Sequence, residues 1–243
     1  EPESFHDQDH CRLCSQCSTL DYCPLDYKGT VGEGYSNQQL VDLVLKDRDF
    51  YGNTGGGVTL SGGEVLSQPI ESLHQLVQDF KSKGISIALD TSGYGELSAI
   101  KTLLPYLSLI LFDIKMIDNQ LHAQLVGTDN TLILQNLKWL LDHKPEHLKL
   151  HLRLPLLQPF HTSESYLADL LSWLDTHDKN HGIDQIDLLP YHSMGQQKGV
   201  HLLDPIKLEV YSAPTTEMMQ VIENALQQRG YLVTVGGTLG GTL

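Results

Sequence analysis

Short apolar runs alternate along the chain with longer segments in which apolar residues recur every three or four positions. A short continuous run between turn residues is typical of a buried strand, whereas the longer spacing is typical of a helix that buries one face. The runs predict strands at 57–60, 85–89, 107–112, 148–154, 186–189 and 231–235. The periodic segments predict helices at about 37–48, 69–83, 96–104, 118–125, 130–143, 163–177 and 215–229.

Residues at the ends of these segments support the assignments. Asp118 and Ser163 can cap the helices that follow them, and Thr215 or Thr216 can start the last helix, because such side-chain oxygens accept from free backbone N–H groups. Gly84 and Gly127 are suited to end the preceding helices. Strand and helix alternate repeatedly, so the pattern favours an α/β fold with a parallel sheet covered by helices. In such folds the functional side chains lie at the carboxyl ends of the strands.

Length and composition bound the organisation of the chain. With 243 residues and a hydrophobic fraction of 40%, the chain can form one large core domain. Residues 1–35 are polar, rich in turn residues and carry all the cysteines, so we expect a small insert domain there and the main domain at 36–243. The formal net charge of −14 disfavours binding to nucleic acid.

No segment is expected to enter a membrane. The longest apolar stretches, such as 103–112, are too short to span a bilayer. The acidic, polar start of the chain carries no recognisable signal peptide. These features predict a cytoplasmic protein with neither a nucleic-acid nor a membrane partner, and in that compartment clustered cysteines are more often metal ligands than disulfides.

The spacing of the cysteines points to a metal centre. Cys11, Cys14 and Cys17 are separated by two residues each, and Cys23 follows after five more and precedes Pro24. The series resembles half of a bacterial ferredoxin motif, although its last spacing is two residues longer than usual. Four-cysteine zinc sites also use C-x2-C pairs. We therefore predict an iron–sulfur cluster on these four thiolates, with zinc as the alternative.

Charged and polar side chains follow successive predicted strands. Any one of them has an ordinary explanation, such as capping a turn or lying on the surface. Because the carboxyl ends of parallel strands meet at one edge of a sheet, the whole set predicts an active site at that edge. In chain order the set is Glu64, Asp90 with Thr91, Asp113 with Lys115, Arg153 and His192.

The run from Gly55 to Glu64 places a short strand between two glycine clusters and ends on a carboxylate. Glycines at a strand end let the backbone approach a ligand closely. The run resembles the GGGVTxSGGEP segment of glycyl-radical-enzyme activating enzymes, a branch of the radical S-adenosylmethionine (SAM) proteins, with Val65 where that family usually has proline. Matching segments extend the resemblance over most of the chain: Leu89–Gly93, Phe112–Lys115, Gly127–Asn130, Leu152–Leu154 and Leu188–His192.

This resemblance implies a fold and an activity. The fold is an open partial (β/α)6 barrel of parallel strands with a ferredoxin-like, cysteine-bearing insert. The activity is the generation of a glycyl radical on a partner enzyme by reductive cleavage of SAM at a [4Fe–4S] cluster. The partners are then a glycyl radical enzyme and a reductant of the flavodoxin or ferredoxin type.

The resemblance also implies roles for individual residues. Gly62, Gly63 and Glu64 would hold the amino group and methionine part of SAM, and Lys115 and His192 its carboxylate and ribose region. Hard oxygen ligands suit a small cation, and the family uses the positions of Asp90, Thr91 and Asp113 for a monovalent cation. The predicted cofactor-binding set is Gly62, Gly63, Glu64, Asp90, Thr91, Ser92, Lys115, Arg153 and His192.

One family motif does not occur in the chain. The C-x3-C-x2-C motif, whose three cysteines hold the SAM-binding cluster, is found nowhere among the 243 residues. Because Glu1–Ser4 resembles the stretch that follows this motif, we expect the motif and the first barrel strand to lie upstream of Glu1, and the chain alone to be inactive. The alternatives are a truncated SAM-binding or partner-binding module without radical activity, and a zinc-binding α/β protein.

Overall fold

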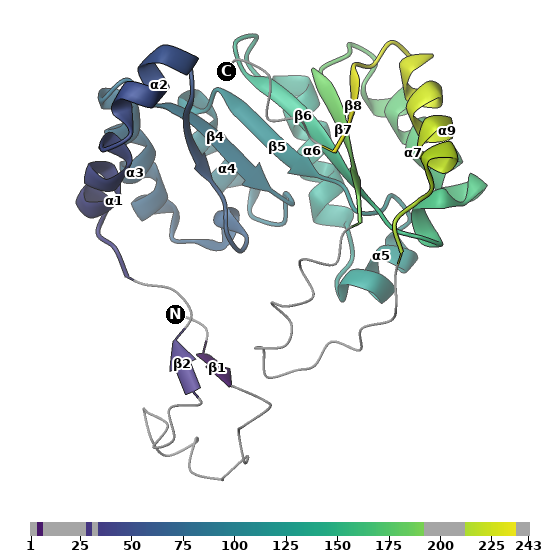
Figure 1. The fold of residues 1–243 in the computed structure, drawn as a ribbon, viewed down its shortest axis with the longest axis horizontal. Coiled ribbons are helices and arrows are strands. Elements are labelled where there is room, and N and C mark those ends of the chain that lie inside the picture. Colours follow the sequence, from purple (N-terminus) through teal and green to yellow (C-terminus); the bar gives the residue numbers. More distant parts are fainter. Residues whose placement is uncertain (1–3, 7–27, 31–33, 192–211, 237–243) are drawn as a thin grey trace. The chain divides into compact units, whose positions relative to one another are not determined.

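The computed structural model describes residues 4–6, 28–30, 34–191 and 212–236, which form two units (Figure 1). The smaller unit comprises Glu1–Ser36 and His192–Ser212. Its described strands are β1 (Ser4–His6) and β2 (Lys28–Thr30), which pair antiparallel. The four cysteines of the predicted metal centre lie outside the described residues. The larger unit comprises Asn37–Tyr191 and Ala213–Leu243.

The larger unit is built on one parallel sheet of six strands (Figure 1). The order of the strands in the sheet is their order in the sequence, and every neighbouring pair is parallel, which confirms the predicted parallel α/β fold. Parallel strands are joined by right-handed crossovers in nearly all proteins, and this rule places the connecting helices on one face of the sheet. The strands are β3 (Gly57–Leu60), β4 (Ser86–Thr91), β5 (Leu109–Asp113), β6 (Lys149–Leu156), β7 (Gln185–Pro190) and β8 (Val233–Val235).

The helices follow the predicted segments closely, and the predicted caps form. Asp118, Ser163 and Thr215 accept from backbone N–H groups three residues further on, over 2.6, 3.2 and 3.3 Å. The α-helices are α1 (Asn37–Leu45), α2 (Arg48–Thr54), α3 (Ile70–Ser82), α4 (Leu97–Leu103), α5 (Asn119–Val126), α6 (Thr131–His143), α7 (Glu164–His177) and α9 (Thr216–Gln227). Single 3-10 turns lie at η2 (Val65–Ser67), η3 (Leu104–Tyr106) and η4 (Phe160–Thr162).

The prediction of one helix over 37–48 was wrong at its carboxyl end. The structure ends α1 at Leu45 and starts the separate helix α2 at Arg48. The residue between them that precedes α2, Asp47, has φ −99° and ψ 15°, outside the helical region, so the helix cannot run through it. Gly55 then closes α2 in the left-handed conformation, at φ 68°.

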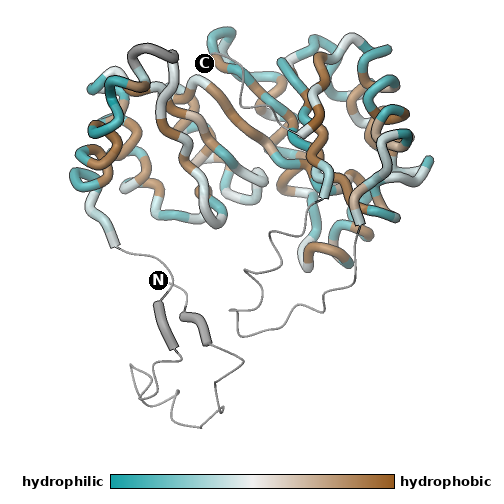
Figure 2. The backbone as a smooth tube through the Cα atoms, in the orientation of Figure 1, coloured by the Kyte–Doolittle hydropathy of each residue, from teal (hydrophilic) through white to brown (hydrophobic). Residues whose placement is uncertain are grey.

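The two faces of the sheet have different compositions. Apolar residues run along the strands and the helices (Figure 2), and on the face toward the helices those of β4 to β7 are buried in one hydrophobic core with helix side chains. We call the opposite side the site face, because it carries Asp90, Asp113, His151, Arg153 and Asp187. Within the described ranges, no helix is both long and apolar enough to cross a membrane.

Candidate functional site

Three predicted site residues meet on the site face, two at the carboxyl ends of β4 and β5 and the third, Arg153, in the middle of β6. The guanidinium of Arg153 donates from Nε to Asp113 Oδ1 over 2.6 Å. It also donates from Nη1 to Asp90 Oδ2 over 3.2 Å, and its Nη2 contacts Asp90 Oδ1 closely. Asp113 and Arg153 are register partners on adjacent strands, which places their side chains on the same face. A single guanidinium therefore lies between two carboxylates.

Burial and charge act against each other in this cluster. Burial raises the pKa of the Asp113 carboxyl above its ordinary value, and the hydrogen bond and charge of Arg153 offset only part of that effect. For Arg153, burial would lower the pKa, but the carboxylates of Asp113 and Asp90 outweigh it and the pKa is raised. The guanidinium stays charged, and it is shared between two acids. Negative charge at this edge is thus incompletely neutralised by the protein.

Glu64 joins the ends of β3 and β4. Its Oε1 accepts from Thr91 Oγ1 over 2.6 Å and from the Leu66 N–H over 3.0 Å. Its Oε2 accepts from both the N–H and the Oγ of Ser92, over 2.9 and 2.6 Å. A carboxylate offers about four acceptor positions, so this side chain is fully used within the protein. Glu64 fixes the glycine loop against the end of β4.

The glycines before Glu64 present their backbone to open space. Gly62 and Gly63 are exposed, and a Cβ placed on either would meet no heavy atom within 4 Å. Gly62 has φ +135°, a conformation that disfavours any other residue. The loop thus combines a fixed end at Glu64 with an accessible backbone, which is the arrangement that a closely approaching polar ligand needs.

The loop after β4 is anchored by a residue of α6 that the sequence analysis did not predict. Asn136, in α6, donates from Nδ2 to the carbonyl oxygens of Gly93 and Gly95, over 2.9 and 2.8 Å. Its side chain is 1% exposed. The sequence does contain a sign of this role, because the polar Asn136 stands among the buried apolar positions of α6, next to Leu137. Gly93 itself has φ +75°, and a Cβ there would lie 2.1 Å from the Phe112 ring.

The loop after β5 is held in the same way. Asn130, which precedes α6, donates from Nδ2 to the carbonyl oxygens of Met116 and Ile117, over 2.8 and 2.9 Å. His161 Nε2 lies 2.5 Å from the carbonyl oxygen of Lys115. Burial lowers the pKa of His161, so the ring is neutral and donates this bond from Nε2–H. The side chain of Lys115 itself is exposed.

The predicted residues therefore form two adjoining groups. The first group consists of Glu64, Thr91 and Ser92. The second group consists of Asp90, Asp113 and Arg153. The two groups adjoin at Asp90, whose Oδ2 accepts from Ser61 Oγ over 3.1 Å. Asp129 lies outside both groups, and its Oδ1 accepts from the Thr131 N–H over 2.9 Å at the start of α6. His192 and the cysteines lie outside the described residues, so their predicted roles stay predictions.

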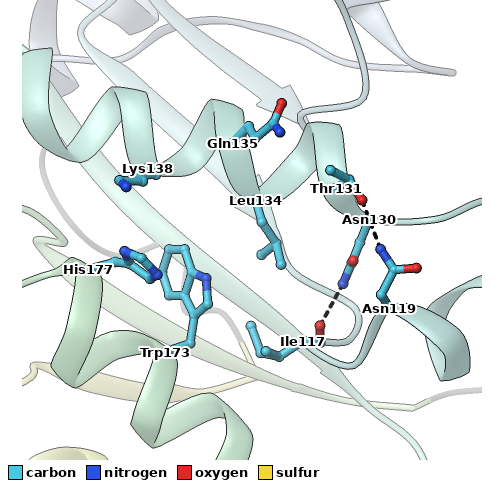
Figure 3. A pocket seen from close by; sticks show the side chains of 9 residues that line it. All are labelled: Ile117, Asn119, Asn130, Thr131, Leu134, Gln135, Lys138, Trp173 and His177. Carbon is cyan, nitrogen blue, oxygen red and sulfur yellow. Dashed lines mark hydrogen bonds between the residues drawn. The ribbon is translucent and has the colours of Figure 1, made fainter.

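A shallow pocket of about 310 Å³ lies apart from these groups, between α6 and α7 (Figure 3). Trp173 and His177 of α7 face Leu134 and Lys138 of α6 across it. None of the predicted cofactor-binding residues lines it. The predicted site residues that the structure describes therefore lie away from this pocket.

Comparisons with known proteins agree on one class. The chain is 36% identical over 212 residues to the choline trimethylamine-lyase activating enzyme of Oleidesulfovibrio alaskensis, covering 87% of this chain and 67% of that protein. It is 32% identical over 228 residues to the pyruvate formate-lyase 2-activating enzyme of Escherichia coli, covering 93% and 75% respectively. No protein-family model matches the chain.

Solved structures show the same fold. A domain of pyruvate-formate lyase-activating enzyme from Bacteroides vulgatus superposes with a TM-score of 0.61 at 25% identity, covering 75% of this chain and 100% of that domain. Coproporphyrinogen III oxidase from Escherichia coli, a radical SAM enzyme, superposes with a TM-score of 0.53 at 15% identity, over 79% of this chain and 47% of that one. The second likeness concerns the fold alone.

Proposed function

Because the chain belongs to the activating enzymes of glycyl-radical enzymes, a branch of the radical SAM proteins, we propose that it binds SAM at the carboxyl ends of β3 to β6. The observation that carries this proposal is the fixed glycine loop beside the Asp90–Arg153–Asp113 cluster. In this family SAM and a [4Fe–4S] cluster, once bound, supply the radical chemistry. The protein supplies binding, orientation and electrostatics.

The described residues suit the polar groups of SAM. The accessible backbone of Gly62 and Gly63 can accept from an ammonium group, and the Glu64 carboxylate follows these glycines directly in the sequence. Since all acceptor positions of Glu64 are already used, we assign it the role of positioning this loop. Among the predicted site residues, the exposed Lys115 and the guanidinium of Arg153 are the cationic groups that can pair with the carboxylate of SAM. Thr91 and Ser92 act through Glu64.

A monovalent cation at Asp90, Thr91 and Asp113 is a separate part of the proposal. What supports it is that two carboxylates share a single guanidinium and keep excess negative charge. Two side chains of the protein compete with a cation for these ligands. Arg153 lies between the two carboxylates, and Glu64 accepts the hydrogen bond of the Thr91 hydroxyl. A cation binding there must share these ligands, so its presence should alter the contacts of Arg153.

The partners follow from the family. The protein acts on a glycyl radical enzyme, and we propose choline trimethylamine-lyase or pyruvate formate-lyase 2 as the class of partner, from the names of the two relatives. A flavodoxin- or ferredoxin-type protein would supply the electron, in the cytoplasm. The four clustered cysteines would hold an accessory [4Fe–4S] cluster.

The cysteine proposal has its own test. Anaerobic reconstitution should give about four iron atoms per chain for a four-cysteine cluster, and Cys14→Ser should abolish its absorption and electron paramagnetic resonance (EPR) signals. Stoichiometric zinc without iron uptake would instead support a zinc-binding protein.

The test of the function is made with the full-length protein encoded by the natural gene, reconstituted anaerobically with reductant and SAM. Release of 5′-deoxyadenosine is measured by chromatography, and the glycyl radical on each candidate partner by EPR. We expect both products. SAM binding without either product would contradict the proposal.

One observation favours a second function for these 243 residues taken alone. They contain no C-x3-C-x2-C motif, so as an isolated chain they would bind SAM or the partner without radical chemistry. The coding sequence upstream of residue 1 decides between the two: a C-x3-C-x2-C motif there supports the enzyme, and its absence supports the binding module.

A further inference from the structure

A second polar cluster lies on the site face, across β6, β7 and β8. It consists of His151, Gln185, Asp187 and Thr234, and the sheet register brings these four side chains together. His151 pairs in register with Gln185, and Asp187 with Thr234. Arg153 is itself the register partner of Asp187, so Asp187 and Thr234 lie in the same row as Arg153. His151 and Gln185 lie two residues earlier on the same face, about 7 Å deeper along the strands.

Asp187 is held firmly without the help of His151. It is 4% exposed, and its Oδ1 accepts from Gln185 Nε2 over 2.6 Å and from Thr234 Oγ1 over 2.5 Å. Its Oδ2 lies 3.8 Å from His151 Nδ1, too far for a hydrogen bond. Removing the imidazole would therefore leave the anchoring bonds of Asp187 in place. A purely structural role for His151 finds no support in these contacts.

The imidazole of His151 has both a donor and an acceptor to offer. Burial lowers its pKa, although Asp187 and Asp184 oppose the shift, so the ring is neutral at pH 7. A neutral imidazole carries one N–H and one free ring nitrogen. None of the described residues hydrogen-bonds this ring, and 23% of the side chain is exposed on the site face.

A peptide group has the matching chemistry, since it also carries one donor and one acceptor that need partners when water is excluded. We propose that His151, whose imidazole lies beside the Asp187 carboxylate, forms a subsite for the polypeptide backbone of the partner enzyme next to its reacting glycine. Half-buried Leu111, the register partner of His151 on β5, adds an apolar surface for the same segment. This inference rests on the proposed function, because only that activity brings a polypeptide to the site face.

The test uses the full-length, reconstituted protein and whichever of pyruvate formate-lyase 2 and choline trimethylamine-lyase the wild type activates. His151→Ala should raise the KM for the partner about tenfold, the effect expected when one hydrogen-bonding group is lost. Formation of 5′-deoxyadenosine without the partner should stay at the wild-type rate. His151→Gln keeps a donor and an acceptor and should restore most of the affinity.

Lys149→Ala is the matched control. Lys149 lies on the same strand and face, but it is 61% exposed and pairs with Asp184, so the KM for the partner should not change. An unchanged KM in His151→Ala would overturn the inference. So would an equal loss of partner-free SAM cleavage, because the residue would then serve SAM or the fold. If the wild type itself releases no 5′-deoxyadenosine, the proposed function fails, and the inference fails with it.

Discussion

The two faces of strand β6 carry side chains with opposite tasks. On the helix side, Leu150, Leu152, Leu154 and Leu156 are each no more than 1% exposed and belong to the core. On the site face the intervening residues are Lys149, His151, Arg153 and Pro155, which are partly or fully exposed. Because successive side chains of a strand point in opposite directions, one short segment serves both stability and binding. Neighbouring residues should therefore respond to substitution in different ways.

The largest effect on stability is expected on the helix side. Leu152→Ala removes a fully buried side chain and leaves a cavity, which costs about 2–5 kcal/mol of unfolding free energy. Urea unfolding followed by circular dichroism measures this change. The exposed Lys149→Ala should stay within about 0.5 kcal/mol of the wild type. Equal losses in the two variants would remove the distinction between the faces.

Glu64→Gln tests whether Glu64 acts mainly by positioning the glycine loop and not by contacting SAM. An amide group replaces one carboxylate oxygen, so donors that now point at that oxygen, from Thr91 and Leu66 or from Ser92, lose their acceptor. We expect a loss of about 1–3 kcal/mol in stability, accompanied by weaker SAM binding in titration calorimetry. Glu146→Gln, at an exposed position, is the control. SAM affinity lost with stability unchanged would show that Glu64 contacts SAM directly.

The acidic residues sharpen the comparison within the site face. Asp90→Ala and Asp113→Ala should weaken SAM binding by the full-length protein and remove its dependence on sodium or potassium. Asp129→Ala should instead cost about 1 kcal/mol of stability, because Asp129 caps the start of α6. Calorimetry with each monovalent cation distinguishes these outcomes. Similar behaviour of all three variants, or indifference to the cation, would refute the cation site.

The smallest predicted effect depends on pH. Burial would raise the pKa of Asp184, but hydrogen bonds from Lys149, the Leu150 N–H and Lys144 outweigh it and the pKa is lowered. A carboxyl with a lowered folded-state pKa stabilises the protein above its unfolded pKa, near pH 4, and this contribution is lost as the pH falls further. Asp184→Asn should remove at most about 1 kcal/mol at pH 7 and less at pH 3. A difference that grows toward acid pH would contradict this assignment.

Local patterns were sufficient to predict most of the fold. Continuous apolar runs located all six strands of the main sheet, and caps such as Asp118 and Ser163 placed the helix starts. The break between α1 and α2 was missed because it depends on the backbone of one residue, Asp47, within a stretch that reads as continuous helix. Periodicity does not record such a local change of conformation.

The site was predictable in its members and less so in its contacts. Parallel strands explain why Asp90 and Asp113 meet at two strand ends, and the register of β5 against β6 brings Arg153 beside Asp113. That Arg153 itself would lie between the carboxylates depends on side-chain reach and register, which the sequence alone does not specify. Asn136 and His161 escaped notice because they act on backbone carbonyl groups far along the chain.

The sequential order of the strands has a consequence for how the chain folds. Each of the strands β3 to β8 pairs only with the strand immediately before or after it in the sequence. Contacts are then as local as a parallel sheet permits, which lowers the loop-closure cost of each pairing. During synthesis, β3 and β4 can pair once β4 has left the ribosome, and every later strand adds to an edge that already exists. We therefore expect each of the strands β4 to β8 to pair with its predecessor as it emerges, without waiting for a distant segment.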